Sequence, residues 1–203
     1  MKYFKKPSIK VDFSTISYGP LKNPSYIQLA SMSFKENGKN KKWEIARTSD
    51  SVCIVLFDTD RKSFVIVRQF RPAVFYQNQE DGYTYELCAG LVDKDKSLEV
   101  IACEEVFEEC GYKISPQDLY FIGSFFSSTG VNGNKQFIYF ANVNEKCKIS
   151  TGGGIEDECI EVLYLPLQDS LSFIFDQQIQ KTTSLFLGIH WYYCFFKIKE
   201  STE

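Results

Sequence analysis

One stretch, Gly90 to Tyr112 (GLVDKDKSLEVIACEEVFEECGY), constrains this chain more than any other. Ser97 is a favoured helix N-cap residue, and Glu99 falls in the following turn, where the helix dipole stabilises an anion. Gly111 is a typical residue to follow a helix C-terminus, because glycine adopts the left-handed conformation at little cost. The stretch therefore predicts a helix from about Leu98 to Cys110.

The predicted helix is acidic on one side and apolar on the other. At roughly 100° per residue, its four glutamates fall on an arc of about 140°. They are Glu104, Glu105, Glu108 and Glu109. Glutamates four residues apart repel each other, at roughly 0.2–0.5 kcal/mol per pair, and a divalent cation would reverse that penalty. The alternative is the solvated polar face of an ordinary amphipathic helix.

The glycines at both ends bear on the choice between these two alternatives. With them, the stretch resembles a Nudix box, the pattern G-x5-E-x7-R-E-U-x-E-E-x-G-U, in which U is a bulky apolar residue. The residues that match in register are Gly90, Glu105, Val106, Glu108, Glu109, Gly111 and Tyr112. Two positions depart from the pattern, since Lys96 replaces its first Glu and Glu104 replaces its Arg. In the family, that Arg helps to hold the catalytic helix and its glutamates in place.

The segments YELCAGLVD and SLEVIACEEVFEECGY resemble the UDP-sugar pyrophosphatase branch of the Nudix superfamily, whose relatives include the ADP-ribose pyrophosphatases. The resemblance runs from about Pro24 to Phe196. It implies an α/β fold, the Nudix α/β/α sandwich with a mixed sheet, plus an N-terminal β-hairpin subdomain. Residues 1–48 would form the arm and the hairpin, used for dimerisation, and residues 49–203 the hydrolase domain. The resemblance also implies a homodimer.

The same resemblance implies a metal site. Glu105, Glu108 and Glu109, with the backbone carbonyl of Ala89, would hold Mg²⁺, with Mn²⁺ as an alternative ion. Arg68 and Arg71 flank the end of a predicted strand, just before Pro72. Arginine binds phosphate oxygens in a bidentate manner, so we expect Arg71, and secondly Arg68, to contact the diphosphate. Ordinary surface salt bridges are the alternative for both.

Two glycine-containing loops are further candidates. Gly130 and Gly133 make the loop 128–133 pliant enough for its backbone to approach a ligand, although a plain hairpin turn is the alternative. That loop lacks the proline found in many ADP-ribose enzymes. Gly152–Gly154 precede three acidic residues, which suits the hinge of a closing lid. In related enzymes a loop glutamate here acts as general base or shapes the metal site. The register selects Glu158, with Glu156 second, and a solvated acidic loop is the alternative.

The rest of the chain predicts a strand-rich core closed by helices. Predicted strands are 26–34, 43–46, 51–57, 63–70, 83–88, 119–127, 136–143 and 159–165, and predicted helices are 166–179 and 181–196. Asn37-Gly38 predicts a hairpin turn, and a slip in alternation between Leu29 and Met32 suggests a bulge. Residues 74–82 are predicted to be a mobile loop, and residues 1–24 an irregular arm or an edge strand.

Composition excludes several classes of partner. A net charge of -3 gives no basic surface for nucleic acid. The longest mostly apolar run, Leu185 to Phe196, is 12 residues, whereas a membrane helix needs about 20. No signal peptide is visible. The seven cysteines include no metal-binding spacing, which favours free thiols in a reducing cytoplasm.

We therefore expect a cytoplasmic, Mg²⁺-dependent enzyme that hydrolyses the diphosphate of nucleoside diphosphate sugars. UDP-glucose would give UMP and glucose 1-phosphate. Two alternatives stay open. One is an ADP-ribose pyrophosphatase. The other is a degenerate Nudix module that binds a nucleotide without cleaving it, which Lys96 and Glu104 would favour.

Overall fold

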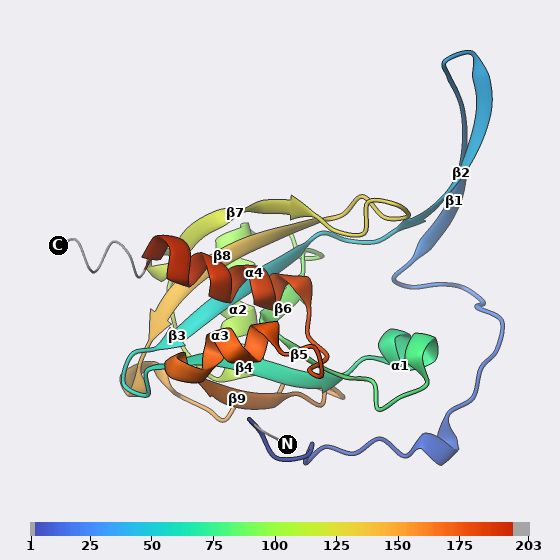
Figure 1. The fold of residues 1–203 in the computed structure, drawn as a ribbon. Helices are drawn as coiled ribbons and strands as arrows, with labels where there is room; N and C mark the ends of the chain where they lie inside the picture. Colours follow the sequence, from blue (N-terminus) through green and yellow to red (C-terminus); the bar gives the residue numbers. More distant parts are fainter. Residues whose placement is uncertain (1–2, 197–203) are drawn as a thin grey trace.

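A seven-stranded mixed sheet carries helices on both of its faces, and a separate two-stranded hairpin projects from one end of it (Figure 1). The computed structural model describes residues 3–196. The strands are β1 Gln28–Glu36, β2 Lys39–Arg47, β3 Ser51–Asp58, β4 Ser63–Phe70, β5 Tyr83–Glu86, β6 Cys88–Leu91, β7 Tyr120–Phe126, β8 Lys135–Val143 and β9 Glu161–Pro166. The helices are α1 Pro72–Asn78, α2 Leu98–Cys110, α3 Leu167–Phe175 and α4 Thr183–Trp191, the last continued by a π-helical turn, Tyr192–Phe196. The expected α/β/α sandwich is confirmed.

The large sheet is split along part of its width. Its strand order is β5-β4-β3-β8-β7, with β6 paired to β3 and β9 paired to β4. Strands β3 and β8 are parallel, and the other pairs are antiparallel. The second half of β3, Leu56–Asp58, pairs with β4, whereas its first half, Ser51–Ile54, pairs with β6. The sheet therefore opens between β5 and β6.

Side chains of β3 and β4 are buried on both faces, which explains their continuous apolar sequences. Alternate residues such as Ile54 and Val67 pack with α2, and those between them, such as Val55 and Ile66, pack with α3 and α4. Since strand side chains alternate, the two layers of the core follow directly from the sequence period of two.

Helix α2 forms where the sequence predicts it. The hydroxyl of Ser97 accepts a hydrogen bond from the Val100 backbone N–H at 3.4 Å. At the other end Gly111 has φ 71°, and its N–H donates to the Phe107 carbonyl at 2.9 Å. The apolar face of α2, including Ile101 and Val106, is buried against the sheet. The glutamate face is thereby turned away from the core, apart from Glu109, which is buried.

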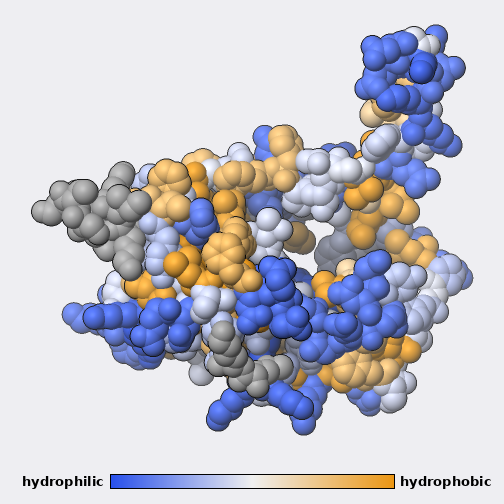
Figure 2. All heavy atoms as spheres, viewed as in Figure 1, coloured by the Kyte–Doolittle hydropathy of each residue, from blue (hydrophilic) through white to orange (hydrophobic). Residues whose placement is uncertain are grey.

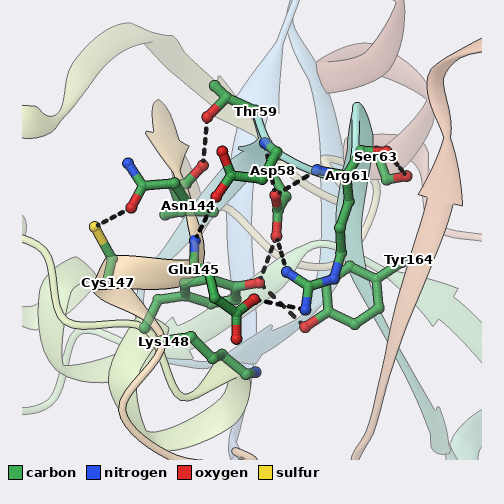
Figure 3. A network of polar contacts seen from close by, with 12 residues as sticks. Asp58, Thr59, Arg61, Ser63, Asn144, Glu145, Cys147, Lys148 and Tyr164 are labelled. Atoms are coloured by element: carbon green, nitrogen blue, oxygen red, sulfur yellow. Dashed lines mark hydrogen bonds and ion pairs between the residues drawn. The ribbon is translucent and has the colours of Figure 1, made fainter.

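A polar network surrounds Asp58 at the start of the β3–β4 turn and includes Arg61 and Glu145 (Figure 3). Asp58 is fully buried and accepts hydrogen bonds from the Tyr112 hydroxyl at 2.9 Å, Arg61 Nη1 at 2.8 Å and the Arg61 N–H at 2.9 Å. Arg61 also pairs with Glu145 at 2.7 Å. Burial alone would raise the pKa of Asp58, but these hydrogen bonds hold it below its usual value.

Two local predictions are wrong. Residues 74–82 were predicted to be a mobile loop, but their first part belongs to helix α1. This helix begins at Pro72, whose ring already fixes φ at a helical value. Gln79, in the left-handed conformation at φ 57°, ends it. The bulge predicted between Leu29 and Met32 is absent, since β1 pairs with β2 residue by residue along its whole length. Both faces of this hairpin are exposed, so the break in the alternation of apolar residues places no apolar side chain on a wrong face and costs no stability.

Hydrogen bonds from β2 fix the hairpin to the body. The indole N–H of Trp43 donates to the Gly130 carbonyl at 2.7 Å, and the Ala46 N–H donates to the Val131 carbonyl at 2.8 Å. The preceding arm is irregular, as predicted, apart from a 3-10 turn at Phe13–Thr15. Within residues 3–196, no helix has the length and apolar character needed to cross a membrane.

Candidate functional site

A cavity of about 1380 Å³ opens at the split in the sheet. Its walls come from the ends of β4, β5 and β6, the glutamate face of α2, the ends of β7 and β8, the loop 155–158 and the segment 181–184 that begins α4. Ala89, Glu105, Glu108, Glu109 and Glu158, all predicted site residues, line it together. The cavity therefore joins the box helix to segments that lie far away in sequence.

Glu109 is the most deeply placed of the box glutamates, with 4% of its surface exposed. Its Oε2 accepts the backbone N–H of Ala89 at 3.0 Å, which fixes the carboxylate against β6. Burial raises its pKa to about 8, and repulsion from Glu105 and Glu158 adds to this although the Ala89 hydrogen bond opposes it. A buried carboxylate with like charges around it is poised to bind a cation.

Glu105 occupies space that only a glycine leaves free. A Cβ atom at position 90 would lie 2.1 Å from Cδ of Glu105, so any side chain there would displace the carboxylate. Burial, followed by repulsion from Glu108, raises the pKa of Glu105 to about 7. The first glycine of the box motif is therefore required by contact with a box glutamate.

The triple-glycine loop is attached to the end of α2. The N–H groups of Gly153 and Gly154 donate to the carbonyls of Glu109 at 2.8 Å and Glu108 at 3.1 Å. Gly152, Gly153 and Gly154 have φ of 70°, 115° and 89°, values that side chains rarely adopt. The glycines thus allow a backbone path with positive φ that caps the end of α2, rather than only a pliant hinge.

This attachment brings the acidic loop to the cavity. Glu156 and Glu158 both line it. Oε2 of Glu158 accepts the Ile155 N–H at 3.0 Å, and a Cβ atom at position 154 would lie 2.7 Å from the same oxygen. The structure therefore brings Glu158 to the box glutamates, as the sequence register predicts.

The two candidate arginines have different surroundings. Arg71 lines the cavity, and its Nε and Nη2 each donate to Glu86 at 2.7 Å. A guanidinium has five N–H donors, so Arg71 retains others for a ligand. Arg68 is 3% exposed, contacts Glu161 at 2.6 Å and the Lys5 carbonyl at 2.9 Å, and is absent from the cavity wall. Arg68 belongs to β4, whereas Arg71 lies just after that strand and precedes α1.

Gly130 is likewise not brought to the cavity. Its carbonyl accepts the Trp43 indole N–H, so it holds the hairpin, while Ser127 and Ser128 of the same loop line the cavity. Sequence reasoning also missed several lining residues. They include Tyr26, Gln69, Lys94, Phe125, Phe126, Gln136 and Lys181. They are isolated in sequence, and only the fold gathers them.

The two departures from the box pattern meet in space. Nζ of Lys96 lies 2.5 Å from Oε1 of Glu104, and Lys94 Nζ lies 3.4 Å from Oε2 of Glu104 and 4.0 Å from Oε1 of Glu105. The lysine at the motif's Glu position thus pairs with the glutamate at its Arg position. The hydrogen bond from Lys96 lowers the pKa of Glu104. The two residues that depart from the pattern therefore form an ion pair with each other.

Exchanging the charges of this pair should therefore be tolerated better than changing one of them. We expect Glu104→Lys to lower kcat, because it places like charges together beside Glu105, and Lys96→Glu/Glu104→Lys to recover much of that loss. The pair is partly exposed, so the coupling in stability should be about 0.2–1 kcal/mol. Steady-state kinetics and thermal unfolding of the four proteins in this cycle measure it. A double variant no better than Glu104→Lys would contradict the pairing.

The donor chemistry of the site fits a hard divalent cation. Carboxylates and a backbone carbonyl are the ligands that Mg²⁺ accepts, and Glu105, Glu108, Glu109 and Ala89 all line one cavity. In the described part of the chain, no three His, Cys, Asp or Glu side chains are already gathered into a complete metal site. The ligand set accordingly stays a prediction, although the site concentrates negative charge at the required place.

The raised pKa values of Glu105 and Glu109 predict how the stability of the protein depends on pH in the presence of EDTA. A carboxyl whose pKa rises on folding, as for Glu109 from 4.5 to about 8, stabilises the folded state fully below the lower value and loses this effect as pH rises through the upper one. We expect Tm to fall between pH 5 and pH 8, and Glu109→Gln to reduce that fall. Thermal unfolding by circular dichroism measures both slopes. Equal slopes in the two proteins would contradict the burial argument.

Comparison with known proteins gives the class. The NUDIX domain model matches residues 47–187, more than half of the 203-residue chain. The chain therefore belongs to the Nudix family, and it is a Nudix hydrolase.

Relatives within the family point to one branch. Uridine diphosphate glucose pyrophosphatase NUDT14 of Bos taurus is 37% identical over 196 residues, which covers 83% of this chain and 88% of the relative. The Mus musculus protein of the same name is 32% identical over 88% of this chain and 93% of its own. GDP-mannose pyrophosphatase of Salmonella arizonae is 36% identical over 77% and 82% of the two chains.

Proposed function

We propose that this protein hydrolyses the diphosphate of nucleoside diphosphate sugars, with UDP-glucose the first candidate, to give UMP and glucose 1-phosphate. The observation that carries the proposal is the set of acidic side chains fixed around one cavity, with Glu109 held by Ala89 and Glu105 by the space at Gly90. The names of the mammalian and bacterial relatives support the substrate class.

The proposed mechanism must overcome the negative charge of the diphosphate. Glu105, Glu108, Glu109 and the Ala89 carbonyl would hold Mg²⁺, or Mn²⁺, which supplies charge neutralisation and a bound water of lowered pKa. Arg71, oriented by Glu86, would donate its remaining N–H groups to phosphate oxygens. Glu158 would accept a proton from the attacking water, since its loop brings it to the same cavity.

The test compares UDP-glucose, GDP-mannose and ADP-ribose, each with Mg²⁺ and with EDTA, and separates products by chromatography. Metal-dependent release of UMP and glucose 1-phosphate, faster than AMP from ADP-ribose, is the expected result. A preference for ADP-ribose would keep the chemistry and change the substrate. Nucleotide binding without turnover on any of the three would overturn the proposal in favour of a degenerate binding module.

We further propose that residues 1–48 form a dimerisation subdomain of a homodimer and residues 49–203 the hydrolase domain. The base of the hairpin is hydrophobic while its tip is hydrophilic (Figure 2), and Leu29, Met32 and Trp43 are exposed. Such a projecting hairpin is too small to be stable by itself. Sedimentation at micromolar concentration should give a dimer, and Leu29→Asp/Trp43→Ser should weaken it. A wild-type protein sedimenting only as a monomer would refute the proposal.

A cytoplasmic location is proposed from the thiols. All seven cysteines are free, and Cys53, Cys88 and Cys110 are buried. Free thiols persist in a reducing compartment. Cell fractionation tests the location, and recovery with a secreted or membrane fraction would exclude it.

A further inference from the structure

The catalytic cavity has two ends of different chemistry. One end is aromatic and apolar, and Tyr26, Leu91, Phe125 and Phe126 line it with 78%, 41%, 43% and 63% of their surfaces exposed. Exposed aromatic rings in a cavity offer faces for a flat ring, and base stacking contributes roughly 1–3 kcal/mol per base. This end has the chemistry of a base-binding site.

The other end is polar and rich in hydrogen-bonding side chains. Gln69, Lys181 and Thr183 line it, beside the buried Ser184. Within residues 3–196 the side chains of Gln69 and Thr183 have no hydrogen-bond partner, so their groups remain available to a ligand. Nζ of Lys181 donates to the carbonyls of Asp176 at 2.7 Å and Ile179 at 3.1 Å and retains a third N–H.

Sheet register places the two ends on opposite sides of the glutamates. Leu91, Ser51, Gln136 and Phe125 form one row across β6, β3, β8 and β7, so the aromatic end extends towards β7. The polar end lies beyond the split. Lys181 forms an isolated β-bridge with Tyr85 of β5. The residue before Tyr85, Thr84, pairs with Gln69 of β4.

The reacting groups lie between these ends. Glu109 bonds to the backbone of Ala89 and Glu105 packs on Gly90, and both backbone positions belong to β6, which borders the split. A nucleoside diphosphate sugar has the same order of parts, a flat base, a diphosphate and a ring bearing hydroxyl groups. The order of chemistry along the cavity therefore matches the order of groups along the substrate.

We propose that Gln69, Lys181 and Thr183 form the subsite for the sugar, and that Phe125 and Phe126 form the subsite for the base. The proposal rests on the proposed function, because it assigns the ends of the same cavity. The amide of Gln69 can both donate to and accept from sugar hydroxyls, and the Thr183 hydroxyl can do the same. Selectivity for the sugar then comes from β4 and the start of α4, which the box motif does not include.

UDP-glucose carries a sugar that UDP lacks, and comparing each variant with the wild type on both ligands separates the two subsites. We would measure KM for UDP-glucose and the inhibition constant of UDP with Mg²⁺, and both dissociation constants by calorimetry in EDTA. The near-isosteric variants Gln69→Leu and Thr183→Val should weaken UDP-glucose about tenfold, the effect of one or two lost hydrogen bonds, and leave UDP within about twofold. The matched variant Phe126→Ala should weaken both ligands by about fivefold or more.

The outcomes are separable. Three results would overturn the sugar subsite. Gln69→Leu and Thr183→Val could weaken UDP and UDP-glucose equally, or they could change the binding of neither ligand. The third such result is that the wild-type protein binds neither ligand. A selective loss of UDP-glucose binding by Phe126→Ala would reverse the assignment and so overturn it too. Failure of the wild-type protein to hydrolyse any of UDP-glucose, GDP-mannose and ADP-ribose would refute the proposed function alone, because calorimetry still compares UDP with UDP-glucose.

Discussion

Glu109→Gln should abolish nearly all turnover while the protein stays folded. The amide can still accept the Ala89 N–H through its Oε1, so β6 and α2 keep their contact. It cannot supply the negative charge that holds a cation. A metal site contributes several kcal/mol to the transition state, and each 1.36 kcal/mol is tenfold, so kcat should fall by about 100-fold or more. Steady-state hydrolysis of UDP-glucose with Mg²⁺ measures it.

The matched control is Glu99→Gln on the same helix. Glu99 lies in the first turn of α2 and accepts the Tyr139 hydroxyl at 3.0 Å, outside the cavity wall. We expect Glu99→Gln to keep kcat within about threefold, because its loss affects the helix terminus by only about 0.3–1 kcal/mol. Glu105→Gln should resemble Glu109→Gln. A fully active, folded Glu109→Gln protein would rule out the metal assignment.

Local signals predicted helix α2 well. Ser97 and Gly111 cap α2 at the residues expected from the sequence, and the period of the glutamates places one face at the cavity. The strands of the core were also predictable, since β3 and β4 are buried on both faces and read as unbroken apolar runs. These features depend on interactions within a few residues, which a sequence displays directly.

Features that depend on tertiary contacts were not predictable in the same way. Arg68 and Arg71 look equivalent in sequence, yet only the packing of β4 shows that Arg68 meets Glu161 and Arg71 meets the cavity. The glycines at 152–154 suggested flexibility, but their positive φ values serve hydrogen bonds to the end of α2. Nothing in the sequence around Lys181 indicates that it lines the cavity, because its position depends on a backbone β-bridge to Tyr85.

The pairing of Lys96 with Glu104 shows why a motif departure has to be read in three dimensions. Taken singly, each substitution replaces a charge by its opposite and suggests a weakened box. In the fold the two side chains lie 2.5 Å apart, so the changes compensate each other. The substitutions therefore do not by themselves favour a degenerate binding module.

Asp58→Ala should destabilise the protein by about 3–5 kcal/mol, the largest stability effect we expect from a single polar substitution. The change removes the buried carboxylate that accepts from Arg61, the Tyr112 hydroxyl and two backbone N–H groups, although the Arg61 side chain itself is 38% exposed. At roughly 2–4 °C for each kcal/mol in a chain of this size, Tm should fall by about 6–20 °C. Thermal and urea unfolding at pH 7 measure the loss.

Glu145→Gln is the matched control, because Glu145 binds the same Arg61 at 2.7 Å but has 63% of its side chain exposed. An exposed ion pair contributes about 0–1 kcal/mol, so this variant should remain close to wild type. The network also holds Tyr112, the last residue of the box, so Asp58→Ala should lower kcat at temperatures where the protein is still folded. Equal stability of the two variants would show that Asp58 does not anchor α2 to the β3–β4 turn.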